Sequence, residues 1–215
     1  SRKSILILKC YKNPAEMRGI FLVDPILGRC YNIGIFKQKE SKLGTRSRIA
    51  VMHGDVVKSV YCHWDGYLEH NGRILLEHYE SSKANHLVAL GDVSSLRPEI
   101  GEEHPFSRFD TDISDAAWES RYGNMTTFYG RDRGETDTGF KVAHTFDEFY
   151  DQVDACGGEW YYVMRDGVWY VGNTYSVSYR KQLVPLAEAL ADQDIDKEDD
   201  DTESVLIQQF VGAVK

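Results

Sequence analysis

Two short segments hold the side chains best suited to chemistry. The first is Tyr61-Cys62-His63-Trp64-Asp65-Gly66-Tyr67, where a β-prone run enters a turn. Side chains two residues apart share one face of a strand, so Tyr61, His63 and Asp65 are predicted to project together, with Tyr67 close by. Histidine exchanges protons near neutral pH, and Asp65 could orient His63 for acid–base work. The structural alternative is that Asp65-Gly66 is a turn and the aromatic side chains belong to the core.

The second segment is Phe128-Tyr129-Gly130-Arg131-Asp132-Arg133-Gly134-Glu135. Arg131 and Arg133 could bind a phosphate or carboxylate through paired hydrogen bonds, and N–H groups of the turn could add an anion nest. The structural alternative is a solvated loop whose charges pair among themselves, namely Arg131, Asp132, Arg133 and Glu135. A further basic cluster, Thr45-Arg46-Ser47-Arg48, would complete a local basic pocket if Arg46 met the two loop arginines.

An acidic run, Asp192–Glu203, has the spacing of an EF-hand loop, with acids at positions one, three, five, seven, nine and twelve. Lys197 stands at the sixth position, where that loop needs glycine for its turn. The run is therefore interpreted as a solvated linker, with a contact to a basic partner or a calcium site as the alternatives. Phosphate-loop, dinucleotide, zinc-protease and serine-hydrolase motifs are absent, and no histidine pairs with cysteine at zinc spacing. We expect no cofactor and no metal.

Composition sets the class of protein. The chain has 215 residues, of which 42% are apolar and 12% aromatic, as in a folded globular protein. Its net charge of −9 argues against general nucleic-acid binding, which depends on neutralising phosphates. No apolar run approaches the ~20 residues of a membrane span, and the N-terminal run breaks at Lys9, too early for a secretory signal. Four scattered cysteines suit a reducing compartment, so a cytoplasmic location is expected.

The pattern of strands and turns predicts an α+β fold, an antiparallel sheet built from hairpins with a few short helices packed on it. Two hairpins are expected, one turning at Gly54-Asp55 and one at Arg165-Asp166-Gly167. The second joins strands rich in tryptophan and tyrosine, so one aromatic face is predicted to be buried and the other partly open. Further strands are expected at Ser4–Lys9, Gly19–Val23, Cys30–Phe36, Met125–Tyr129 and Phe140–His144.

Helices are predicted over Glu69–Tyr79, Lys83–Leu90, Leu183–Ala191 and Ser204–Val214, with one helical turn in Ile113–Glu119. A capping box at Thr145–Glu148 predicts another helix that runs to Ala155. Asp92–Ser107 is predicted to be a loop. Three parts are expected: a β-rich extension over residues 1–43, an α+β core over residues 44–181, and a helical segment with an acidic linker over residues 182–215.

Four segments resemble, in the same order, an uncharacterised family of small proteins encoded by tailed bacteriophages and prophages. They are Gly44–Ile49, Tyr61–Tyr67, Leu90–Leu96 and Thr127–Glu135, and the resemblance covers roughly residues 44–172. The resemblance implies expression in the cytoplasm of an infected bacterium, and it assigns no activity or catalytic residue. In such proteins the Gly-Thr-Arg-Ser stretch resembles the start of the chain, so residues 1–43 are an extra module or an upstream extension.

Two classes of function follow. The first is a phage accessory protein that binds a host protein for takeover or counter-defence, using complementary charge and aromatic anchors. The second is a protein that binds a small ligand or nucleotide, with or without catalysis. It would hold a phosphate-bearing molecule in a His/Asp/Arg pocket. Convergence of the site residues in one pocket would favour the second class. A virion component ranks below both, since the sequence has no fibrous repeat.

Overall fold

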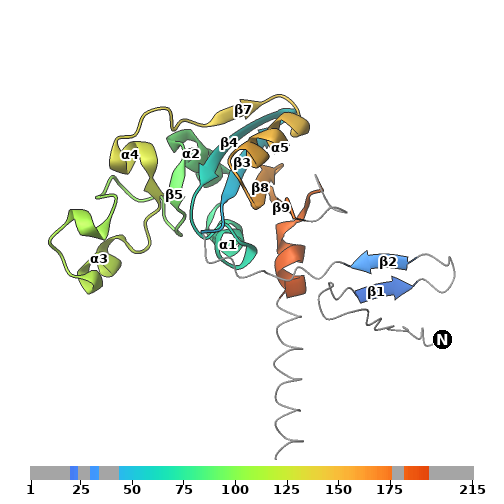
Figure 1. Cartoon of the computed structure of the whole chain (residues 1–215), viewed down its shortest axis with the longest axis horizontal. Coiled ribbons are helices and arrows are strands. Elements are labelled where there is room, and N and C mark those ends of the chain that lie inside the picture. Colours follow the sequence, from blue (N-terminus) through green and yellow to red (C-terminus); the bar gives the residue numbers. More distant parts are fainter. Residues whose placement is uncertain (1–19, 24–29, 34–43, 176–181, 194–215) are drawn as a thin grey trace, which may run out of the picture. The chain divides into compact units, whose positions relative to one another are not determined.

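The computed structural model of the chain describes residues 20–23, 30–33, 44–175 and 182–193 (Figure 1). The chain divides into two compact units, residues 1–40 and 41–215. In the first unit, β1 (Ile20–Val23) pairs with β2 (Cys30–Ile33) in antiparallel fashion, so two of the expected strands are confirmed. The predicted strand Ser4–Lys9 and helix Ser204–Val214 lie outside the described residues.

The second unit is built on one mixed, mostly antiparallel sheet, as an α+β fold requires. The strands run in the order β10-β9-β8-β3-β4-β5-β6, and β7 pairs with β4. Parallel pairing joins β3 to β8 and β4 to β5, and the other pairs are antiparallel. The strands are β3 (Ser47–His53), β4 (Val56–Cys62), β5 (Val93–Ser95), β6 (Thr127–Phe128), β7 (Lys141–Ala143), β8 (Trp160–Arg165), β9 (Val168–Asn173) and β10 (Val184–Pro185).

Both predicted hairpins are present because their turn residues accept the required backbone angles. Gly54 has a φ of 58° between β3 and β4, as the first central residue of a type II′ turn needs. Asp166 and Gly167 have φ values of 51° and 80°, as a type I′ turn needs. Because β3 and β8 run parallel, both turns lie at the same end of the sheet.

The helices are short and lie mostly between strands. They are α1 (Arg73–His78), α2 (Ser81–Leu90), α3 (Asp115–Tyr122), α4 (Tyr129–Arg133) and α5 (Phe146–Ala155), with a π-helical turn η1 (Leu68–Gly72) before α1 and a 3₁₀ turn η2 (Arg108–Asp110) before α3. Residues 186–193 are also helical. The helix predicted from Leu183 therefore begins three residues later, because Val184 and Pro185 pair with β9 instead.

Two other predictions of local structure were wrong. The segment predicted as the loop Asp92–Ser107 contains β5, which pairs with β4 through Cys62 and Val93 and with β6. The strand predicted over Met125–Tyr129 keeps only Thr127 and Phe128, since the chain turns into α4 at Tyr129. Both segments are held by partners distant in the sequence, which local patterns do not report.

Both faces of the sheet are covered by helices. On one face, Leu75 of α1 and Leu87 of α2 pack with Ile49 and Tyr162. On the other, Phe149 and Val153 of α5 pack with Ala50 and Tyr161, among others. The aromatic hairpin is therefore buried on both faces: Trp160, Tyr161, Tyr162 and Trp169 are each at most 7% exposed. Tyr170, which lies on the α5 face, is partly exposed, so the predicted open face is reduced to this side chain.

Helix α5 begins at the predicted capping box, but the Glu148 side chain binds the backbone one residue earlier than expected. Thr145 Oγ1 accepts a hydrogen bond from the Glu148 N–H at 3.1 Å. The Glu148 carboxylate accepts from the N–H of His144 at 2.7 Å, one residue before the cap. Both bonds satisfy backbone donors at the start of the helix. Phe149, Tyr150 and Val153 are buried.

Candidate functional site

Tyr61 and His63 lie on one face, as their spacing predicts. Their side chains form a hydrogen bond of 2.6 Å between the Tyr61 hydroxyl and His63 Nδ1. Arg46 interacts with both side chains. Burial raises the pKa of Tyr61, and Arg46 opposes that rise. Burial lowers the pKa of His63, and the Arg46 charge lowers it further. The arrangement is a phenol hydrogen-bonded to an imidazole, close to a guanidinium.

Asp65 does not orient His63. Strand β4 ends at Cys62, and Asp65 adopts a left-handed backbone with φ 56°, which takes it off the strand face. The Asp65 carboxylate instead adds to the effect of burial in raising the pKa of Tyr67. The Tyr67 ring lies 5.9 Å from the ring of His70. The turn alternative describes Asp65 better than the acid–base alternative.

Arg131 forms a buried clamp with its own neighbour. It donates to Asp132 from Nε at 2.7 Å and from Nη2 at 3.0 Å. Its other N–H groups donate to backbone carbonyls of Ile100, Gly101 and Thr126. These five bonds use all five guanidinium N–H groups. Arg131 therefore keeps no donor for the phosphate that its sequence context suggested.

Asp132 completes the clamp from a fully buried position. Its side chain is 0% exposed and accepts from the N–H groups of Phe128, at 2.7 Å, and His104, at 3.2 Å. Together Arg131 and Asp132 fasten the segment around residues 100–104 to β6. The two residues that looked like an anion clamp thus hold the backbone in place.

Arg133 and Glu135 pair with each other at 3.2 Å on the surface. Arg133 also lies over the ring of Phe106, 4.9 Å from its centroid. Tyr129 links this loop to the first segment, because it interacts electrostatically with Tyr61 as well as with Arg133 and Glu135. The structure therefore brings Arg46, Tyr61 and His63 together, with Tyr129 beside them, and leaves Arg131 and Asp65 apart.

A polar cluster beneath α5 was not predicted from the sequence. Arg48 is 1% exposed and donates to Ser59, whose hydroxyl in turn donates to Gln152 of α5 at 3.1 Å. Asp92 accepts a hydrogen bond from the Tyr61 N–H at 2.8 Å. The sequence did contain a sign of this cluster. Arg48 occupies an inward position of a strand whose other inward residues are small or apolar, such as Ala50.

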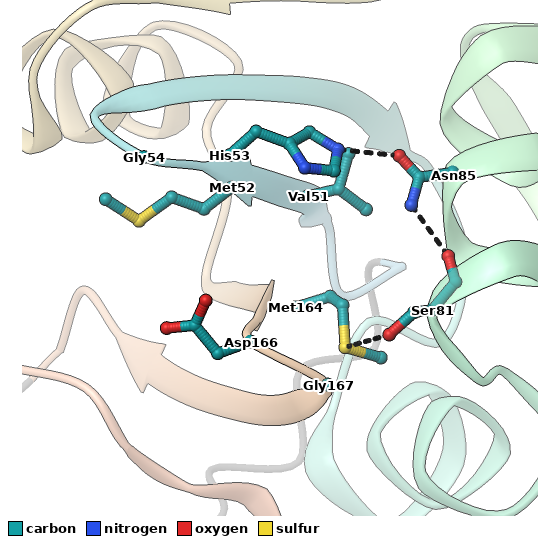
Figure 2. Close-up of a pocket in the computed structure, with 9 residues that line it drawn as sticks. All are labelled: Val51, Met52, His53, Gly54, Ser81, Asn85, Met164, Asp166 and Gly167. Atoms are coloured by element: carbon teal, nitrogen blue, oxygen red, sulfur yellow. Dashed lines mark hydrogen bonds between the residues drawn. The ribbon is translucent and has the colours of Figure 1, made fainter.

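A separate cavity of about 330 Å³ lies where the two hairpin turns meet the start of α2 (Figure 2). His53 Nε2 bonds to Asn85 Oδ1 at 2.8 Å, and Asn85 Nδ2 donates to the Ser81 carbonyl at 2.7 Å. The Ser81 hydroxyl lies 3.6 Å from the Met164 sulfur. None of the residues predicted for a site lines this cavity. Its polar groups largely bond to one another, which leaves few donors for a ligand.

Residues 101–122 form an arm that ends in α3, and Figure 1 shows α3 set apart from the sheet. Its base is fastened by the Arg131–Asp132 clamp. Inside the arm, the ring of Tyr122 stacks on His104 at 5.3 Å and meets Trp118 at 4.9 Å. At its η2 turn, Phe109 is 90% exposed.

Comparison with protein-family models, with curated proteins and with solved structures found no significant match. In the part of the chain that the structure describes, no helix is long and apolar enough to cross a membrane. Within the same residues, no three or more histidine, cysteine, aspartate or glutamate side chains are grouped to hold a metal. The class shown is an α+β protein.

Proposed function

We propose that this protein is a phage accessory protein that binds a host-cell protein, and that the arm formed by residues 101–122 is its binding surface. The phage origin rests on the resemblance of the four segments described above. The observation that supports the binding role is Phe109, a large apolar side chain left 90% exposed on an ordered turn. Exposed aromatic side chains of this kind are typical anchors of protein interfaces.

The turn that presents Phe109 is held by its own hydrogen bonds. Ser107 accepts from the Phe109 N–H at 3.2 Å, and the Asp110 carboxylate accepts from the Ser107 N–H at 3.0 Å. Arg108 Nε donates to Asp115 at 2.6 Å, which ties η2 to the start of α3. A preorganised turn loses little conformational freedom on binding, and that favours affinity.

The charge around Phe109 indicates the chemistry of the partner. The arm carries six exposed acidic side chains and two arginines, Arg108 and Arg121. The acidic residues are Glu102, Glu103, Asp110, Asp112, Asp115 and Glu119. A complementary partner has an apolar pocket for the phenyl ring within a basic surface. Acidic rims mainly speed association, so binding should weaken as salt rises.

The test is photocrosslinking from the anchor position. The chain carries benzoylphenylalanine in place of Phe109, is irradiated in bacterial lysate, and its crosslinked partner is identified by mass spectrometry. The partner is then purified and titrated with wild type and with Phe109→Ala. Full burial of a phenylalanine side chain contributes about 1.5–3 kcal/mol, so Phe109→Ala should weaken binding roughly 10- to 100-fold.

Tyr175 provides the matched control, because it is an aromatic side chain outside the arm that is 61% exposed. Tyr175→Ala should leave the affinity unchanged, and the affinity of wild type should fall between low and high salt. Equal affinity for wild type and Phe109→Ala would reject the arm as the binding surface. A purified partner that binds through an acidic patch of its own would reject the stated chemistry.

A further inference from the structure

Arg48 carries a buried positive charge whose hydrogen-bond partners are neutral. Its side chain lies on the α5 face of the sheet and the residue is 1% exposed. Nε donates to the Ser59 hydroxyl at 2.8 Å, and Nη2 donates to the Ser59 carbonyl at 3.3 Å. Buried charges in proteins are usually paired with an opposite charge, since removing an ion from water is costly.

No carboxylate of the described residues supplies that pairing directly. Asp92 is near enough for its pKa to be lowered by the Arg48 charge, although burial, the larger influence, raises it. However, Asp92 Oδ1 accepts from the Tyr61 N–H, and no ion pair within 4.0 Å joins Arg48 to an acid in the described part of the chain. Asp92 therefore interacts with the Arg48 charge electrostatically, without forming an ion pair with it.

Three N–H groups of Arg48 find no acceptor among the described residues: two on Nη1 and one on Nη2. They lie at the terminal edge of the guanidinium. That edge binds an oxyanion through two parallel hydrogen bonds. Neither terminal nitrogen is among the buried polar atoms that lack a partner, so this edge of the guanidinium reaches solvent. The unpaired edge of Arg48 is thus suited to a small oxyanion.

The surroundings favour a phosphate over a carboxylate. Tyr61 is the cross-strand neighbour of Arg48, and Arg46 interacts electrostatically with Tyr61. Lys141 of β7 pairs across the sheet with Ser59, the residue to which Arg48 donates. Arg48, Arg46 and Lys141 thus lie near the acids Asp92 and Glu159, the second of which interacts with Arg46. A group of three cations suits a dianion better than a monoanion.

We propose that Arg48, assisted by Arg46 and Lys141, binds the phosphate group of a small molecule on the α5 face of the sheet. The ligand enters beside Tyr61 and His63, where the surface is partly open. The phosphate oxygens accept from the terminal edge of Arg48, and Arg46 provides a second positive charge. This site is independent of the Phe109 arm, so either proposal can fail alone.

The experiment titrates the full chain with inorganic phosphate at constant ionic strength, set with sodium chloride. Binding is followed through the guanidinium resonances of Arg48 in nitrogen-15 NMR spectra, and acetate is titrated in parallel. We expect a saturable shift of the Arg48 signals with phosphate and weaker binding of acetate. Arg46→Ala should weaken phosphate binding about tenfold, as loss of one charge-assisted contact predicts.

Arg46→Ala is the informative variant because Arg46 is exposed, whereas truncating buried Arg48 threatens the fold itself. Arg121→Ala is the matched control, since Arg121 is an exposed arginine of α3 that lies over the Tyr122 ring. It should bind phosphate as wild type does. The proposal is overturned if phosphate gives no saturable Arg48 shift, or if both variants bind equally. Acetate binding as tight as that of phosphate would overturn the choice of ligand.

Discussion

Arg131 and Asp132 are adjacent in the sequence, and their side chains form a two-bond ion pair that is almost entirely buried. The exposed fractions of their side chains are 15% and 0%. Adjacent residues of a helix point in different directions, so this pairing needs the short α4 and the bend that precedes it. Because the pair also binds the backbone at residues 100, 101 and 104, it decides where the arm begins.

Removing the acid from this pair should destabilise the protein strongly. Asp132→Ala leaves Arg131 buried without its counter-charge and leaves the N–H groups of Phe128 and His104 without an acceptor. Breaking a buried pair in this way costs about 3–5 kcal/mol of unfolding free energy. Urea denaturation followed by circular dichroism measures the loss.

The exposed pair of the same loop is the control. Glu135→Ala removes the partner of Arg133 on the surface, where such pairs contribute about 0–1 kcal/mol. Similar losses for Asp132→Ala and Glu135→Ala would contradict the structural role assigned to the buried pair.

The pKa of His63 should respond to Arg46. Burial and the Arg46 charge both place it below the ordinary value of 6.5, so the folded protein resists protonating His63. The unfolded chain then binds more protons between the two pKa values, and stability falls as pH drops through 6.5. Above pH 6.5 this contribution to stability is fully present. Proton NMR titration of the His63 ring measures the folded pKa directly.

Arg46→Ala should raise the pKa of His63 and leave the part of the shift that comes from burial. Arg121→Ala should not move it, because that arginine lies on α3 rather than beside His63. A His63 pKa at or above 6.5 in the wild-type protein would show that the ring is more hydrated, or closer to an acid, than the structure places it.

The sequence was sufficient wherever structure depends on neighbours along the chain. Gly54-Asp55 and Asp166-Gly167 specify their hairpins through backbone angles, and Thr145 specifies the start of α5 through a local hydrogen bond. The α+β class follows from those elements. Strand β5 was missed because it is three residues long and partly polar, and its pairing with Cys62 of β4 joins residues that a helical segment separates.

The candidate site was harder to predict, because it depends on which partners reach each side chain. Tyr61 and His63 met because their spacing alone puts them on one face. The role of Arg131 is decided by carbonyls about 30 residues away, and no local pattern reports these. Whether the aromatic hairpin is exposed depends on helices packing on both faces of the sheet, which periodicity does not show.

Cys62 should be chemically inert in the folded protein. It is 0% exposed, and burial raises the pKa of its thiol to about 11, against an ordinary value of 9.0. The thiolate is the reactive form, so at pH 8 the fraction available for alkylation is small, and the surrounding side chains also exclude the reagent. Iodoacetamide at pH 8, followed by peptide mapping, should label Cys62 only after denaturation.

Cys156 is the internal comparison for that experiment. It is a free cysteine that is partly exposed near the end of α5, and its thiol donates to the Val153 carbonyl at 3.2 Å. Native labelling should therefore reach Cys156 well before Cys62. Because Cys62 lies beneath Asn71 in the core shared by β4 and β5, its labelling rate also reports opening of that part of the sheet. Labelling of Cys62 as fast as Cys156 in the native protein would mean that this edge of the sheet opens readily, contrary to the packing described.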